Sequence, residues 1–245
     1  TAYSTLGTAY LILAIPVALL VRDSPRRELI TTEAAPAQKD GSPFPLSTTT
    51  VVLWISGAVV FCCIAMAIPI VHLVPLLTDN GLSPKNAVTV FLFLMIAGAF
   101  GRILGGKLAD HIGALQSYAC MSVLQTSVIF ILPHTQNIIL IYILAMIFGL
   151  AFSGVMVSFL VCIRMMVPGR YLARSMATVA MFGWIGMGLG GWQGGYIFDL
   201  TGNYFWSYGS GSIAGIINLI ILFFFYQHIR KNNKPQKLVK KSAFS

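Results

Sequence analysis

The chain has 245 residues, of which 57% are hydrophobic and 9% charged, and its formal net charge is +9. An ordinary soluble domain carries about a quarter of its residues as charges, so a water-soluble globule of this composition is excluded. The mean hydropathy of +0.81 indicates an integral, multi-pass membrane protein. The all-α class follows because no stretch has the alternating polarity of barrel strands.

A helix needs about 20 apolar residues to cross a bilayer. Seven runs are long enough, and we predict a transmembrane helix for each: 1–21, 51–77, 87–108, 114–132, 137–163, 175–198 and 206–228. Short segments separate the last six runs, so those helices should be antiparallel neighbours. The first run is set apart by residues 22–50, whose charges and prolines are typical of a solvated linker.

The start of the chain is already apolar and begins at Thr1. The run 1–21 has neither a basic start nor a small-residue cleavage site, so it is a poor signal peptide. We interpret the chain as a fragment that lacks its N-terminal part. The alternative is a complete seven-helix protein whose initiator methionine has been removed.

Positive charge predicts the orientation. If the linker 22–50 is cytoplasmic, 15 of the 16 Lys and Arg residues fall on that side, and only Lys85 lies on the other. The linker and the basic tail 229–245 are therefore predicted to be cytoplasmic, in the plasma or inner membrane. This bias explains the net charge without a nucleic-acid partner. We interpret the tail as a retention signal, with contact to anionic headgroups as the alternative.

Two ionisable residues, Arg102 and His72, lie away from the ends of the predicted spans, where charge is costly and often functional. Arg102 carries a permanent charge whose planar fork can hold a carboxylate, so we predict a substrate-anion ligand. The alternative is an arginine that reaches back to the cytoplasmic interface or pairs with an acid at a helix end. His72 lies between Pro69 and Pro75 and could bind substrate or carry a proton. A packing histidine with one backbone partner explains it equally well. All seven acids lie in loops or at helix ends.

Glycines are concentrated in the sixth run. We predict close helix packing at positions that lie four residues apart, either as static packing or as a seam that leaves room for sliding or bending. These are Gly186, Gly190, Gly191, Gly194 and Gly195.

Catalytic and metal-binding patterns are missing from the sequence. It contains no H-E-x-x-H, no Walker lysine and no G-x-S-x-G, which argues against an enzyme. The cysteines lie in apolar runs and are typical of packing residues. No metal and no cofactor is predicted.

Residues 101–113 read GRILGGKLADHIG. This segment resembles the signature of the major facilitator superfamily between its eighth and ninth helices, and the motif residues would be Gly101, Gly105, Gly106, Asp110 and Gly113. The usual basic residues are replaced by His111 and Ala114. A second segment, GYIFDLTGNY at 195–204, is similar to the end of the family's eleventh helix. The resemblance implies that 1–21 is the sixth helix of a carrier, 22–50 its central linker and 51–228 its six-helix C-terminal half.

Residues 72–83, HLVPLLTDNGLS, followed by Gly101 and Arg102, resemble the monocarboxylate-transporter and oxalate/formate-antiporter branch. In that branch the eighth-helix arginine binds the substrate carboxylate, which implies this role for Arg102. The chain departs from that branch at two points. Gly98 replaces an aspartate of the animal monocarboxylate carriers, and the run 175–198 lacks the lysine of oxalate exchangers. Without that second cation, a monoanion fits better than a dicarboxylate.

The resemblance implies a secondary active carrier of small organic anions that works by alternating access, with the missing N-terminal half as its partner. Protons are the candidate coupling ion. One alternative is a carrier of the same fold for a drug, a sugar or another neutral metabolite. An alternative of another class is a seven-helix receptor-like protein, although the run 206–228 has no lysine for a retinal Schiff base.

Overall fold

The computed structural model describes residues 44–242 together with Thr8, Ile12, Ile15 and Pro16; for 233–242 the description is limited to the backbone. The chain divides into two units, residues 1–37 and 38–245. The four described positions of the first unit are helical. Most of the predicted span 1–21 and of the linker 22–50 lies outside the described residues.

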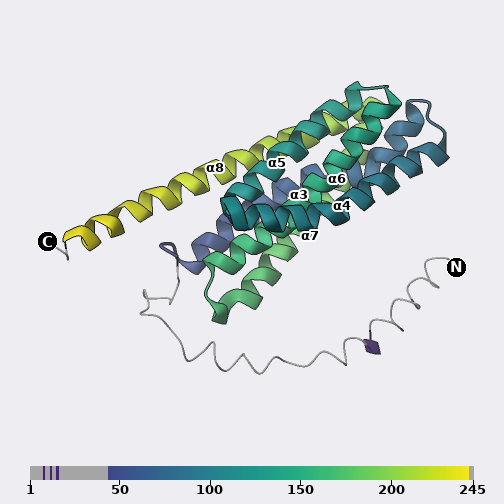
Figure 1. Ribbon diagram of the computed structural model, residues 1–245. Coiled ribbons are helices and arrows are strands. Elements are labelled where there is room, and N and C mark those ends of the chain that lie inside the picture. The colour runs from purple at the N-terminus through teal and green to yellow at the C-terminus, as the bar shows by residue number, and fades with distance from the viewer. Residues whose placement is uncertain (1–7, 9–11, 13–14, 17–43, 243–245) are drawn as a thin grey trace. The chain divides into compact units, whose positions relative to one another are not determined.

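The second unit is built from long helices that follow one another along the chain (Figure 1). They are α3 (Thr48–Asp79), α4 (Pro84–Ile112), α5 (Ala114–Ile131), α6 (Ile138–Met166), α7 (Gly169–Thr201) and α8 (Tyr204–Ser242), with a 3-10 turn η1 (Leu132–His134) after α5. Among the described residues, these six helices are long and apolar enough to cross a membrane. The predicted all-α class and the last six spans are therefore confirmed; the count of seven is not.

Several helices are longer than their apolar runs. The predicted connection 109–113 is helical up to Ile112, and Gly113, with φ at 96°, is the residue that ends α4. Only Val167 and Pro168 separate α6 from α7, where residues 164–174 were expected to form a connection. Charged residues end an apolar run without ending the helix. The helix continues until a residue such as Gly113 interrupts it.

The packing of the six helices follows an internal repeat. α4 packs chiefly along α6 and α7 along α3, while α5 packs on α6 and α8 on α3. α5 and α8 also pack on each other. The pattern is unchanged when α3, α4 and α5 are exchanged in order with α6, α7 and α8, as expected for nested three-helix repeats.

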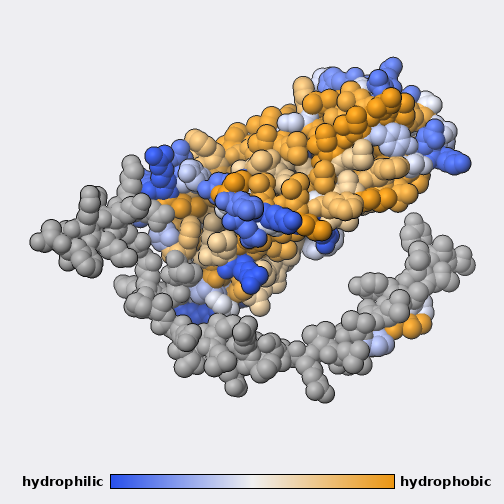
Figure 2. Space-filling view, in the orientation of Figure 1, coloured by the Kyte–Doolittle hydropathy of each residue, from blue (hydrophilic) through white to orange (hydrophobic). Residues whose placement is uncertain are grey.

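The outside of this unit is mostly apolar. Figure 2 shows hydrophobic side chains over its sides and most of the hydrophilic ones near its two ends. Exposed large residues on this surface include Phe100, Ile103, Trp192 and Phe223. Such a surface matches lipid rather than water, and the chain is an integral membrane protein.

Candidate functional site

The helix α4 positions the predicted ligand Arg102. It begins after Ser83, whose Oγ accepts a hydrogen bond from the backbone N–H of Asn86 at 3.4 Å. Gly101 and Gly105 form its buried stripe against α6. A Cβ on Gly101 would overlap the backbone of Leu150, and a Cβ on Gly105 would lie 2.6 Å from the Cα of Gly154. This tight seam fixes the rotation of α4 about its axis.

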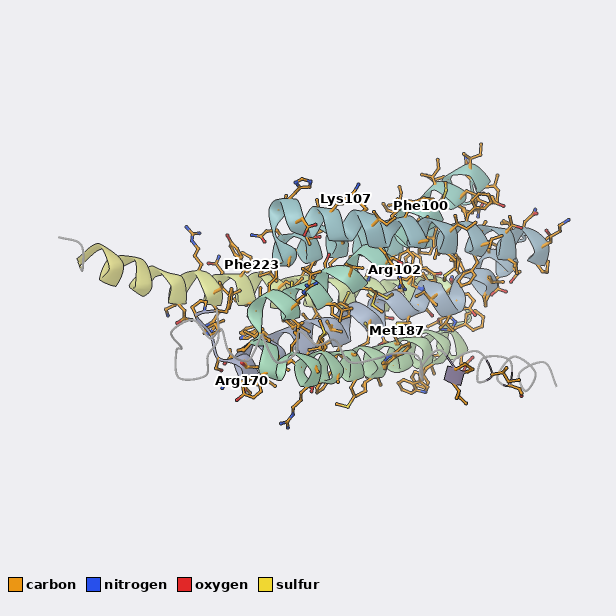
Figure 3. All side chains as sticks on the ribbon, turned by 60° about the horizontal axis from the view of Figure 1, so that its bottom comes forward. Phe100, Arg102, Lys107, Arg170, Met187 and Phe223 are labelled. Carbon is orange, nitrogen blue, oxygen red and sulfur yellow. The ribbon has the colours of Figure 1, made fainter. Side chains whose placement is uncertain are left out.

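Because successive helix residues are about 100° apart, Gly101 contacts α6 while its two neighbours lie on opposite flanks of α4. Figure 3 shows this directly: Arg102 extends toward the side of α7, and Phe100 and Lys107 extend to the opposite side. Met187 of α7 extends toward Arg102 in the same view. Arg102 thus extends from the flank of α4 opposite the one that carries Phe100.

Among the Lys, Arg, Asp and Glu residues of the six described membrane spans, Arg102 lies farthest from the end of its span. It lies ten residues before Ile112, or about 15 Å of helix rise. The side chain is exposed, and it has no hydrogen bond or ion pair to another described residue. All five guanidinium N–H groups are therefore available to a ligand.

The second predicted ligand, His72, has a partner within the bundle. Its side chain is 8% exposed, and Nε2 donates to the carbonyl of Gly191 on α7 at 2.9 Å. The ring centroid lies 5.6 Å from that of Tyr204 on α8. The structure therefore places His72 in the seam of α3 with α7 and α8, and its predicted role as a substrate ligand stays a prediction.

The predicted signature residues are brought together on α4, not in a loop. Gly101 and Gly105 are buried, Gly106 is half-buried and Asp110 is exposed. Gly113 needs its positive φ, and a Cβ there would also lie 2.6 Å from the Oε1 of Gln116. Their role as a conformational motif remains a prediction.

The glycines of α7 form a seam against α3. Cβ atoms on Gly186 and Gly190 would lie within 3 Å of Val60 and Ile64, and one on Gly194 would strike the ring of His72. Gly191 and Gly195 have only ordinary contacts at 3.5 and 3.8 Å. Three of the five predicted packing glycines therefore carry the close approach.

Sequence reasoning missed the polar interior of α5. The Tyr118 hydroxyl donates to Oδ1 of Asn218 on α8 at 3.1 Å, and Nε2 of Gln125 donates to the carbonyl of Cys62 on α3 at 3.3 Å. All four residues are at most 1% exposed. The available signal was the spacing of polar residues at 118, 122 and 125, which marks one face of an apolar helix. Among the described residues, no cluster of His, Cys, Asp or Glu could hold a metal.

The sequence model of the Major Facilitator Superfamily matches residues 53–245. This chain belongs to the major facilitator superfamily. Members of this family are transporters rather than enzymes, and the membership agrees with the six apolar helices of the described residues and with their internal repeat. Two relatives are Monocarboxylate transporter 13 of Rattus norvegicus and of Bos taurus, each 32% identical over 70% of this chain. The match covers 42% of each relative, so the chain spans less than half of their length.

Proposed function

We propose that this chain is the C-terminal half of a secondary active carrier for small monocarboxylate-like anions. The main support for the proposal is Arg102, because it is a permanent charge within a span and all its guanidinium N–H groups are available to a ligand. A guanidinium holds a carboxylate through two parallel N–H···O bonds, and this pairing is strong where water is scarce. The names of the two relatives support the same substrate class.

The neighbours of Arg102 favour a monoanion over a dianion. In the view of Figure 3, Met187 of α7 extends in the direction of Arg102 and offers an apolar thioether. The other cations of α4, Lys85 and Lys107, lie near its two ends. A substrate with one carboxylate and a short apolar body would satisfy the arginine and leave no second charge unpaired.

The proposed mechanism is alternating access, with the substrate held between this half and an N-terminal half. α7 and α4 are the least buried of the six spans, which supports their facing that second half. In this arrangement 1–21 is the sixth helix, 22–50 the cytoplasmic linker, 51–228 the transport half and 229–245 the cytoplasmic tail. The membrane would be the plasma or inner membrane, and protons are the candidate coupling ion.

Uptake of labelled lactate into proteoliposomes tests this proposal. The complete carrier should transport lactate, and this 245-residue chain alone should not. Arg102→Gln should lower uptake by about 30-fold or more, since losing one partner of a desolvated charge pair costs about 2–5 kcal/mol. Lys85→Gln is the matched control on the same helix. Undiminished lactate uptake by Arg102→Gln, or transport of only a neutral sugar, would refute the anion assignment.

A further inference from the structure

The glycine-rich part of α7 is held from two sides by side chains that bond to its backbone. From α3, Nε2 of His72 donates to the carbonyl of Gly191 at 2.9 Å. From α8, the hydroxyl of Ser207 donates to the carbonyl of Gly194 at 2.7 Å. His72 and Ser207 are both buried. Two carbonyls three residues apart on one segment of α7 are thus hydrogen-bonded to different helices.

This segment needs such support because it contains five glycines, at 188, 190, 191, 194 and 195. Glycine is a weak helix former and leaves the backbone free to bend. The missing side chains also make the carbonyls accessible to donors. The fit is close, because a Cβ on Gly194 would lie 2.6 Å from Cδ2 and 2.7 Å from Nε2 of His72.

The ring of His72 is also fixed by its surroundings. The ring of Tyr204 packs on it, and Tyr204 in turn stacks on Phe198 of α7 with centroids 4.2 Å apart. Because the carbonyl of Gly191 can only accept, the proton must be on Nε2. His72 therefore donates to α7 from a fixed position.

We propose that His72 and Ser207 are positioning residues that fasten the glycine-rich segment of α7 to α3 and α8. These two hydrogen bonds fix the position of the Met187 flank of α7 relative to Arg102 on α4. The consequence for transport rests on the proposed function, but the effect on the position of α7 does not.

The chain offers matched variants. His72→Gln keeps an amide N–H at the same reach as Nε2, and His72→Phe keeps a ring but loses the donor. Ser207→Ala removes the second donor. The control is His134→Phe, because Nδ1 of His134 bonds to the carbonyl of Phe130 within its own turn and the side chain is exposed.

The first readout is the distance distribution between spin labels at Val88 on α4 and Leu200 on α7, both exposed near the same end of the bundle. It is measured on the complete carrier after replacement of its native cysteines. His72→Phe and Ser207→Ala should broaden the distribution, while His72→Gln and His134→Phe should leave it narrow. If His72→Phe fails to fold, Ser207→Ala decides. An unbroadened distribution in the folded donor-loss variants would overturn the proposal, whatever the substrate is.

The second readout is lactate uptake. His72→Phe should lower the maximal rate at least fivefold with KM changed less than twofold, and His72→Gln should restore the rate. A tenfold rise in KM for both variants would instead mark His72 as a substrate ligand and overturn the positioning role. If lactate is not transported but His72→Phe broadens the label distances, the proposed function fails and the fastening stands.

Discussion

At the scale of single residues, neighbours in sequence have different tasks because of the helix period. Gly101 is buried against α6, and Arg102, one position later, extends toward the side of α7. Because Gly101 has no side chain, α4 packs closely on α6, and this contact fixes the rotation of α4 and so the direction of Arg102. A change at either residue should therefore act on the same site, Gly101 through packing and Arg102 through charge.

The pair Tyr118–Asn218 gives a prediction at this scale. Their buried hydrogen bond, 3.1 Å long, joins α5 to α8. In a double-mutant cycle with Tyr118→Phe and Asn218→Leu, thermal unfolding in detergent should give a coupling free energy of about 0.6 kcal/mol, and at most about 1.7 kcal/mol. A coupling free energy of zero would mean that the bond contributes nothing to the association of α5 with α8.

The residue scale also shows how far sequence reasoning reached. Arg102 could be predicted because a lone guanidinium in an apolar run is conspicuous by itself. The partner of His72 could not be, because Gly191 is 119 positions away and offers only a backbone carbonyl. The bond between Tyr118 and Asn218 could not be predicted either, because the residues are 100 positions apart and each alone is an ordinary polar residue in a span.

At the scale of elements, the two seams α4–α6 and α7–α3 are equivalent under the internal repeat, and both depend on glycine. Gly101 and Gly105 serve the first seam, and Gly186 and Gly190 serve the second. Small residues let the backbones approach, and this packing drives association where lipid removes the hydrophobic effect.

Gly101→Ala tests the first seam. The added methyl would overlap the backbone of Leu150, so unfolding free energy should fall by about 1–3 kcal/mol. Gly188→Ala is the control, since a Cβ there meets nothing within 4 Å. It should be neutral, or stabilising by up to about 1 kcal/mol through helix propensity. Equal melting temperatures for the two variants in detergent would argue against the seam.

Element boundaries were less predictable than element existence. The six spans were evident from hydropathy, yet the run 87–108 became the helix Pro84–Ile112. Its true ends depend on the cap at Ser83 and on the positive φ of Gly113, which hydropathy does not register. The glycine spacing of four on α7 indicated packing, but only the structure separates Gly190, which touches α3 closely, from Gly191.

At the scale of the whole molecule, the described six-helix unit has two kinds of uncovered surface. One is the apolar exterior, which suits lipid. The other is the side where Arg102 and Met187 extend toward each other from α4 and α7 (Figure 3). A carrier needs the second surface to be reached by water from one side of the membrane at a time.

Cysteine labelling distinguishes these surfaces. Met187→Cys, in the complete carrier without native cysteines, should react with a water-soluble maleimide and should be protected by lactate. Ile185→Cys is the matched control, because Ile185 is exposed, lies about 200° around α7 from Met187, and should face lipid. Faster labelling of Ile185→Cys than of Met187→Cys would place the aqueous path along the Ile185 side of α7 and would contradict the account.

The most direct test of the central claim is equilibrium binding of a monocarboxylate and of its neutral amide to the purified complete carrier. The account predicts that the acid binds and the amide does not, that Arg102→Lys weakens binding of the acid because the planar fork is lost, and that Arg102→Gln abolishes it. Equal binding of acid and amide, or undiminished binding of the acid to Arg102→Gln, would contradict the account.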